Sequence, residues 1–218
     1  MSRDDWYRRT TWSDTDRSEF QARLKRSRGD FHKSQYVRIQ AGYLFGAGLV
    51  FPAIELLQQL FDEFPHESQL AQAHVQHAEC LLALDRVDEA VTAYRAAFAA
   101  EQSYPNSRTQ LWLDFPWLVV TRRLSHLYSD VDSFLDWGGR QITFPVDEFR
   151  LSTILSFLAD DQGDSETAQR HAAIALSAAE KEHSGFRYHP TVGLVGKQDA
   201  NVSERLLRLA GGTPKVID

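Results

Sequence analysis

Histidine and cysteine are the side chains of this chain best suited to hold a metal ion or to attack a substrate. His74 and His77 lie one helical turn apart, and His183 and His189 stand in the segment HSGFRYHP. Zinc accepts imidazole nitrogen but normally takes three or four protein ligands. The chain has no HExxH motif and a single cysteine. We therefore expect no metal and no other cofactor, and we interpret His74 and His77 as helix-packing residues.

The candidates for nucleophilic or acid–base catalysis have simpler structural interpretations. Cys80 precedes two leucines in an expected helix, where a thiol is typical of a small buried hydrophobic residue. No G-x-S-x-G turn is present to expose a serine. The adjacent carboxylates at 147–148 and 160–161 are interpreted as solvated charges at helix ends. We predict no catalytic residues, and a small enzyme or metal-binding protein with a site near the His183–His189 loop is the alternative.

Gly185 and Pro190 break the helical pattern in HSGFRYHP and leave its side chains on irregular backbone. The last hairpin of a helical array needs a cover over its apolar face. The apolar residues of 186–195 and a final helix over NVSERLLRLAG can supply this cover. In the other interpretation the loop lies in a binding groove and presents Arg187 and Tyr188 to a ligand. The sequence favours the cap and leaves the groove open.

The charge of the chain is unevenly distributed. The net charge is -6 over 218 residues, but residues 1–40 carry ten Lys and Arg against six Asp and Glu, so the remainder carries -10. The overall sign argues against nucleic acid as a partner, because phosphate binding needs a cationic surface. The basic run RLKRSRGDFHK is interpreted as a solvated helix face that pairs with the acidic remainder. An anionic partner on this run is the alternative.

The composition predicts a folded protein of the cytoplasm. Hydrophobic residues make up 43% of the chain, and its single cysteine cannot form an intrachain disulfide. The longest nearly apolar run, YLFGAGLVFPAI, falls short of the roughly 20 residues that span a bilayer. Charges occupy the first residues, where a signal peptide needs an apolar stretch. We expect no membrane association, and the sequence leaves oligomerisation open.

Two segments repeat the same helical hairpin after 37 residues. In each copy the second helix carries apolar residues at positions 0, 3, 4, 7, 10 and 11, the spacing of one buried stripe. Ala41 and Ala78 match in the first helices at the same shift. Helices cross closely only where side chains are short, so alanine at such positions is a packing requirement. The stripes consist of Val50, Ala53, Ile54, Leu57, Leu60 and Phe61, and of Val87, Ala90, Val91, Tyr94, Ala97 and Phe98.

This layout resembles the tetratricopeptide repeat (TPR), a helix–turn–helix unit with small residues midway along the first helix and at two places in the second. The family's aromatic residue in the first helix is replaced by Val37 and His74, and the period exceeds the family's roughly 34 residues. The resemblance implies an all-α fold, an α-solenoid of TPR-like helical hairpins (an alpha-alpha superhelix) with a C-terminal capping segment. Such a solenoid binds a protein or peptide on its concave face.

The organisation expected along the chain is a single all-helical domain, 1–218, of about ten helices and no strand. Its parts are an N-terminal basic helix (1–33), two TPR-like hairpins (34–101), a diverged hairpin (105–140), a TPR-like hairpin (147–182) and a C-terminal cap (183–218). Turns between paired helices are expected at Gly48, Asp85 and Gly163. Helix starts are predicted at Ser13, Asn106, Asp130, Asp164 and Asn201, whose side chains can accept from free backbone N–H groups.

The predicted function is a non-catalytic scaffold or adaptor, such as a toxin-neutralising immunity protein or a secretion chaperone if the source is bacterial. In the resembling family the partner surface comes mainly from the first helix of each hairpin. Val75 and Glu79 stand where its clamp for a C-terminal carboxylate uses basic and Asn residues, so that clamp is not expected. The predicted partner-binding residues are Gln35, Arg38, Phe45, Gln72, Val75, Glu79, Arg150 and Phe157, with Arg187 and Tyr188 from the loop.

Overall fold

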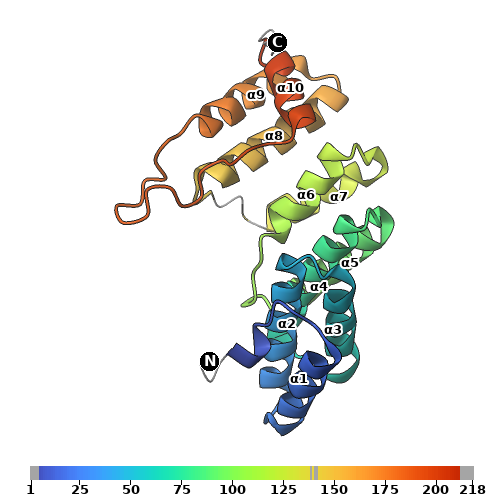
Figure 1. Ribbon diagram of the computed structural model, residues 1–218. Coiled ribbons are helices and arrows are strands. Elements are labelled where there is room, and N and C mark those ends of the chain that lie inside the picture. The colour runs from blue at the N-terminus through green and yellow to red at the C-terminus, as the bar shows by residue number, and fades with distance from the viewer. Residues whose placement is uncertain (1–4, 138, 140–141, 212–218) are drawn as a thin grey trace. The chain divides into compact units, whose positions relative to one another are not determined.

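The computed structural model describes residues 5–137, 139 and 142–211 (Figure 1). These residues form ten α-helices and two short 3-10 helices and contain no β-strand, which confirms the all-α prediction for this part of the chain. The remaining positions lie outside the described residues; they belong to the predicted basic helix, diverged hairpin and cap, except 141, which lies between two predicted parts. The chain divides into two compact units, Met1–Leu111 and Trp112–Asp218.

The first unit contains two helix hairpins of equal layout. Its elements are η1 (Asp5–Tyr7), α1 (Asp14–Arg26), α2 (Asp30–Gly46), α3 (Val50–Glu63), α4 (Glu67–Ala83) and α5 (Val87–Ser103). Helix α2 packs on α3 and α4 packs on α5, while α2 and α3 both contact α4. The first residues of α2 and α3 recur 37 positions later as the first residues of α4 and α5. The sequence repeat therefore corresponds to two consecutive hairpins.

The core of the first unit contains the alanines that the repeat predicted at packing positions. Ala41, Ala53, Ala78, Ala90 and Ala97 are all buried in the helix pairs. The larger side chains of the stripes, such as those of Leu57, Leu60 and Tyr94, are buried around them. Phe20 and Leu24 of α1 belong to the same core cluster as the residues of α2 and α3. Helix α1 therefore covers the outer face of the first hairpin.

The second unit also pairs its helices. Its elements are α6 (Leu111–Thr121), η2 (Ser125–Leu127), α7 (Tyr128–Trp137), α8 (Pro145–Asp161), α9 (Ser165–Ala179) and α10 (Ala200–Leu209). Helix α8 packs on α9, and α10 packs on both. The rings of Phe115 and Phe134 stack 4.1 Å apart between α6 and α7. Aromatic residues therefore occupy the contact that alanines make in the other hairpins.

Two of the five predicted helix starts are correct. The Ser13 hydroxyl accepts from the Asp16 N–H at 3.2 Å, and Asp164 accepts from the Thr167 N–H at 3.1 Å. The predictions at Asn106, Asp130 and Asn201 are wrong. Helix α6 begins at Leu111, whose N–H donates to Thr109 Oγ1, and α7 begins at Tyr128. Asp199 caps α10 by accepting from the Asn201 N–H at 2.8 Å, because its backbone leaves the helix first.

The four helix hairpins of the described residues turn in the same way. The turn residue has a positive φ: 80° at Gly48, 57° at Asp85, 53° at Arg123 and 82° at Gly163. In each turn the next residue donates its N–H to the carbonyl five positions back, at 2.9 Å in all four. This 6→1 hydrogen bond is the mark of a Schellman turn. The α6–α7 hairpin therefore shares the local geometry of the others, although Arg123 gives no glycine signal in the sequence.

Replacing Arg123 with glycine should stabilise the second unit, because the left-handed backbone costs an arginine more than a glycine. We expect Arg123→Gly to raise the free energy of unfolding by about 0.5 to 1 kcal/mol. Gly163→Ala should lower it by a similar amount, since an added Cβ there meets open space and only the backbone is strained. Urea unfolding midpoints measure both. A loss of stability in Arg123→Gly contradicts the turn geometry.

Candidate binding site

A hollow of about 490 Å³ opens on one face of α2 and α4, and we call it the α2–α4 groove. Its α2 residues are spaced by three and four positions, so they form one stripe along the helix. Glycine at two of these positions leaves the backbone bare, which is why the face is hollow. The groove is lined by Thr10, Arg38, Ile39, Gly42, Tyr43, Gly46, Ala47 and Gln76.

Arg38 places a positive charge in this groove without an opposite charge beside it. Its Nε donates to Gln69 Oε1 at 2.8 Å, and Gln69 is neutral. Among the side chains that the structure describes, no carboxylate pairs with Arg38. Burial lowers the pKa of its guanidinium, although an arginine stays charged in proteins. A half-buried cation with only a neutral partner retains strong attraction for an incoming carboxylate.

Gln76 lines the groove and has an acceptor without a donor. Its Oε1 is buried and receives no hydrogen bond from the described residues. A buried acceptor without a donor costs about 1 to 3 kcal/mol. Its Nε2 lies against Gly42, where an added Cβ would come within 3.1 Å. Gly42 therefore makes room for the Gln76 amide, and the amide oxygen lacks the N–H donor that a bound backbone could supply.

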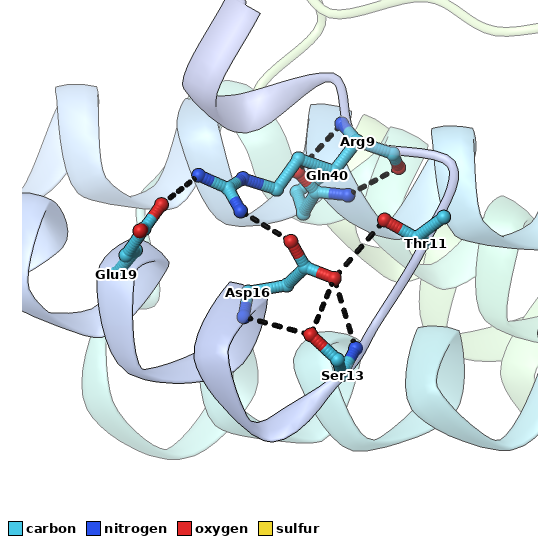
Figure 2. Close-up of polar contacts among 6 residues, drawn as sticks. All are labelled: Arg9, Thr11, Ser13, Asp16, Glu19 and Gln40. Carbon is cyan, nitrogen blue, oxygen red and sulfur yellow. Dashed lines mark hydrogen bonds and ion pairs between the residues drawn. The ribbon is translucent and has the colours of Figure 1, made fainter.

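The N-terminal arm, residues 8–12, shows how α2 binds a non-helical backbone (Figure 2). The Arg9 N–H donates to Gln40 Oε1 at 3.0 Å, and Gln40 Nε2 donates back to the Arg9 carbonyl at 2.8 Å. Gln40 is fully buried, so its amide is fixed for this purpose. One glutamine side chain on α2 thus holds both polar groups of one backbone residue.

The side chain of Arg9 fastens the arm to α1 (Figure 2). It forms ion pairs with Asp16 and with Glu19, the latter at 2.5 Å. Asp16 Oδ2 also accepts from the Ser13 backbone N–H and from the Ser13 and Thr11 hydroxyls. These hydrogen bonds, led by those from Ser13, lower the pKa of Asp16 to about 2. The Asp16 carboxylate therefore stays ionised across the ordinary pH range and keeps Arg9 in place.

A second hollow of the first unit, of about 320 Å³, includes both histidines of α4. The Phe61 ring stacks on His74 at 4.2 Å and lies 5.7 Å from His77, in keeping with the interpretation of these histidines as packing residues. Burial, with a contribution from His77, lowers the pKa of His74 to about 4. Burial and the charge of Arg86 lower the pKa of His77. Both imidazoles are therefore neutral at pH 7.

The second unit has a hollow of about 350 Å³ beside α10, lined by three arginines. The central one, Arg205, is only 8% exposed and lies 4.1 Å above the Phe157 ring. It pairs with Asp160 at 2.7 Å and with Asp161 at 2.6 Å. These carboxylates, interpreted from the sequence as solvated helix ends, are held by Arg205. The arginine thereby joins α10 to the end of α8.

The carboxylates at 147–148 also have structural partners. Asp147 accepts from the Thr143 and Phe144 backbone N–H groups at the start of α8. Glu148 pairs with Lys181 at 2.5 Å. Cys80 is buried, and burial raises the pKa of its thiol to about 12, so it is protonated at pH 7. Each of these groups therefore has a place in the packing or the capping of a helix.

The predicted partner-binding residues fall into different environments. Arg38 alone lines the α2–α4 groove. Val75 and Phe157 are 3% and 2% exposed and belong to the helix core. Arg150 pairs with Asp114 at 2.8 Å and lies over the Trp117 ring, so it joins α8 to α6. Gln35 and Gln72 are half-buried, Phe45 packs on the core cluster, and Glu79, Arg187 and Tyr188 are exposed.

Sequence reasoning missed most of the groove. Gly42, Tyr43, Gly46 and Gln76 line it beside Arg38, and none of them was predicted. Two glycines inside one helix are the signal that was available, because a helix with glycine on one face has bare backbone there. Gln76 carries no such signal, since its burial depends on the helix beside it.

The HSGFRYHP loop folds on itself and extends beyond the helices (Figure 1), and its Phe186 ring lies 5.3 Å from the ring of Phe144 at the start of α8. The Ser184 N–H donates to the Pro190 carbonyl at 2.7 Å, and His183 Nδ1 accepts from the Gly185 N–H at 3.0 Å. Tyr188 is 80% exposed, and the Arg187 guanidinium lies over its ring. The cover on α8 and α9 comes from α10, whose Leu206 is buried.

The described residues contain no group of three or more His, Cys, Asp or Glu side chains placed to hold a metal ion. No helix within this part of the chain is long and apolar enough to cross a bilayer. Comparison with models of protein families, with curated proteins and with solved structures gives no match to this chain.

Acidification should weaken the first unit through His74. The folded-state pKa of about 4 lies below the ordinary 6.5, so the unfolded chain binds the proton first and stability falls as the pH drops from 6.5 toward 4. We expect this group to account for roughly 1 to 2 kcal/mol between pH 7 and pH 4.5. His74→Val, which copies Val37 of the first hairpin, should lose correspondingly less stability over that interval. Equal losses in urea unfolding for both proteins contradict the prediction.

Proposed function

We propose that this chain is a non-catalytic scaffold that binds an extended segment of a protein partner in the α2–α4 groove. The observation that carries the proposal is Arg38, a half-buried cation in the groove whose only described partner is the neutral Gln69 amide. A carboxylate of the partner would give this guanidinium charge-assisted hydrogen bonds. The lone buried thiol of Cys80 fits a protein of the reducing cytoplasm.

The wider architecture that we propose is a TPR-like α-solenoid. Three observations support it: two hairpins of equal layout 37 residues apart, buried alanines where their helices cross, and the same Schellman turn in the four described hairpins. Stacked hairpins of this kind place their first helices along one concave face. Helices α2 and α4 are the first helices of their hairpins, and the groove lies on them.

Three groups of the groove suit an extended peptide. Arg38 would take an acidic side chain, and the Gln76 amide would accept a backbone N–H once its side chain turns toward the groove. Tyr43, 43% exposed, offers an aromatic surface to an apolar side chain. Within this chain, the side-chain amide of Gln40 on α2 already forms two hydrogen bonds with the non-helical backbone of Arg9. A peptide could bind the Gln76 amide in a similar way.

Selection of peptides from a random display library tests the proposal and requires no candidate partner. Peptides enriched on the wild-type chain should share an Asp or Glu, and Arg38→Gln should weaken them about 10- to 100-fold, the value of one charged hydrogen-bond pair. Gly46→Phe should abolish binding, because its side chain enters open space in the groove. Fluorescence anisotropy with a labelled peptide measures each affinity.

Gly196→Phe is the matched control. Gly196 is exposed in the second unit, and an added Cβ there also meets open space, so the added ring should not affect binding. Circular dichroism establishes that all three variants keep their helix content. Peptides that bind Gly46→Phe as tightly as the wild-type chain contradict a site in the groove.

A further inference from the structure

Four cations at the end of α1 stand exposed within six positions: Arg23, Lys25, Arg26 and Arg28. We call them the basic patch. None pairs with a carboxylate among the described side chains, and Arg26 Nε donates only to the Ala22 carbonyl, at 3.1 Å. From the sequence, this run was expected to pair with the acidic remainder of the chain. Arg17, which precedes the run, pairs with Glu55 at 3.1 Å, but the four cations of the patch do not meet the expectation.

The helix dipole explains only part of this arrangement. Arg23, Lys25 and Arg26 occupy the last turn of α1, where cations interact favourably with free carbonyl groups. This effect is worth only about 0.3 to 1 kcal/mol per charge at a surface and leaves the charge itself uncompensated. Arg28 lies beyond the helix, in the turn before α2. The patch therefore retains four positive charges that face solvent.

From these charges we infer that the basic patch binds a short acidic segment of a protein partner. Three of the four side chains are guanidinium groups, whose planar fork matches a carboxylate in two parallel hydrogen bonds. From Arg23 to Arg26 the patch extends over about 5 Å along the helix at about 1.5 Å per residue, and Arg28 continues it in the extended turn after the helix. Three or four consecutive acidic residues suffice to neutralise it. Phe31, three positions after Arg28 and partly exposed, adds an apolar contact at its edge.

The size of the patch favours a short acidic segment over a long polyanion. Its length equals about one Debye length at physiological ionic strength, so its field ends close to its own border. Residues 41–111 of the same unit carry three Arg against nine Asp and Glu, a net charge of -6. A nucleic-acid strand or an anionic bilayer would extend past the patch and meet this negative charge. A short acidic segment meets the cations alone.

Binding of labelled hexaglutamate, followed by fluorescence anisotropy, tests the inference on the full chain. We expect binding at about 50 mM NaCl that weakens at least tenfold by about 200 mM, because several ion pairs form together. Hexaglutamine should not bind. Arg23→Glu with Arg26→Glu should weaken hexaglutamate at least tenfold, and Arg23→Gln with Arg26→Gln should weaken it several-fold without reversing any charge.

The control is Arg170→Glu with Lys197→Glu, which changes the net charge by the same amount at exposed positions of the second unit. It should alter the affinity less than twofold. Equal losses in this control and in the patch variants overturn the inference, because net charge then decides binding. Tighter binding of a six-nucleotide single strand or of phosphatidylserine vesicles than of hexaglutamate also overturns it. These outcomes leave the α2–α4 groove untouched, since no patch residue lines it.

Discussion

The close crossing of paired helices through buried alanine is the constraint on which the rest of the first unit depends. Ala53, Ala90 and Ala97 have no exposed surface, and each sits where its helix meets its partner. A larger side chain at such a crossing costs about 1 to 3 kcal/mol in a packed core. The spacing of these alanines fixes which stripe of each helix is buried. On α2 and α4 the buried alanines are Ala41 and Ala78, and they face inward while the stripe of the groove residues is left outward.

The absence of a side chain at two positions of α2 produces the groove. Gly42 permits the Gln76 amide of α4 to lie against α2, and Gly46 leaves the end of α2 bare. Two polar side chains of this hollow are incompletely matched: the Arg38 guanidinium has a neutral amide as its partner, and the Gln76 amide oxygen has no donor among the described residues. A carboxylate would pair with the Arg38 guanidinium, and a backbone N–H would donate to the Gln76 amide oxygen. An extended acidic peptide has both groups.

Much of the fold could be predicted because its determinants are local. The apolar stripes, the alanines and the caps at Ser13 and Asp164 are each decided within one or two turns of helix. The turn at Arg123 escaped prediction because tertiary packing, and not a glycine, imposes the positive φ there. The cap of α10 was placed two residues late because Asp199 and Asn201 both have suitable side chains, and only the backbone decides between them. Local patterns also say nothing of how the helices gather into two compact units, which depends on contacts between distant residues.

The site was harder to predict because burial on a helix depends on its neighbours. Arg205 has the sequence pattern of a solvated helix charge, yet Asp160, Asp161 and the Phe157 ring enclose it. Val75 and Phe157 lie on the first helices that the resemblance nominated, and their neighbours bury both. Arg38 remains in the groove beside Gly42, which lies one turn later on α2 and has no side chain to cover it.

Side-chain NMR of the complex tests the central claim most directly. When a peptide selected on the wild-type chain is added, the Arg38 Nε–H and Gln76 Nε2–H resonances should both shift, in step with saturation of the peptide. Unchanged resonances at Arg38 and Gln76, with shifts instead at Arg205 and Arg208 beside α10, would contradict the account.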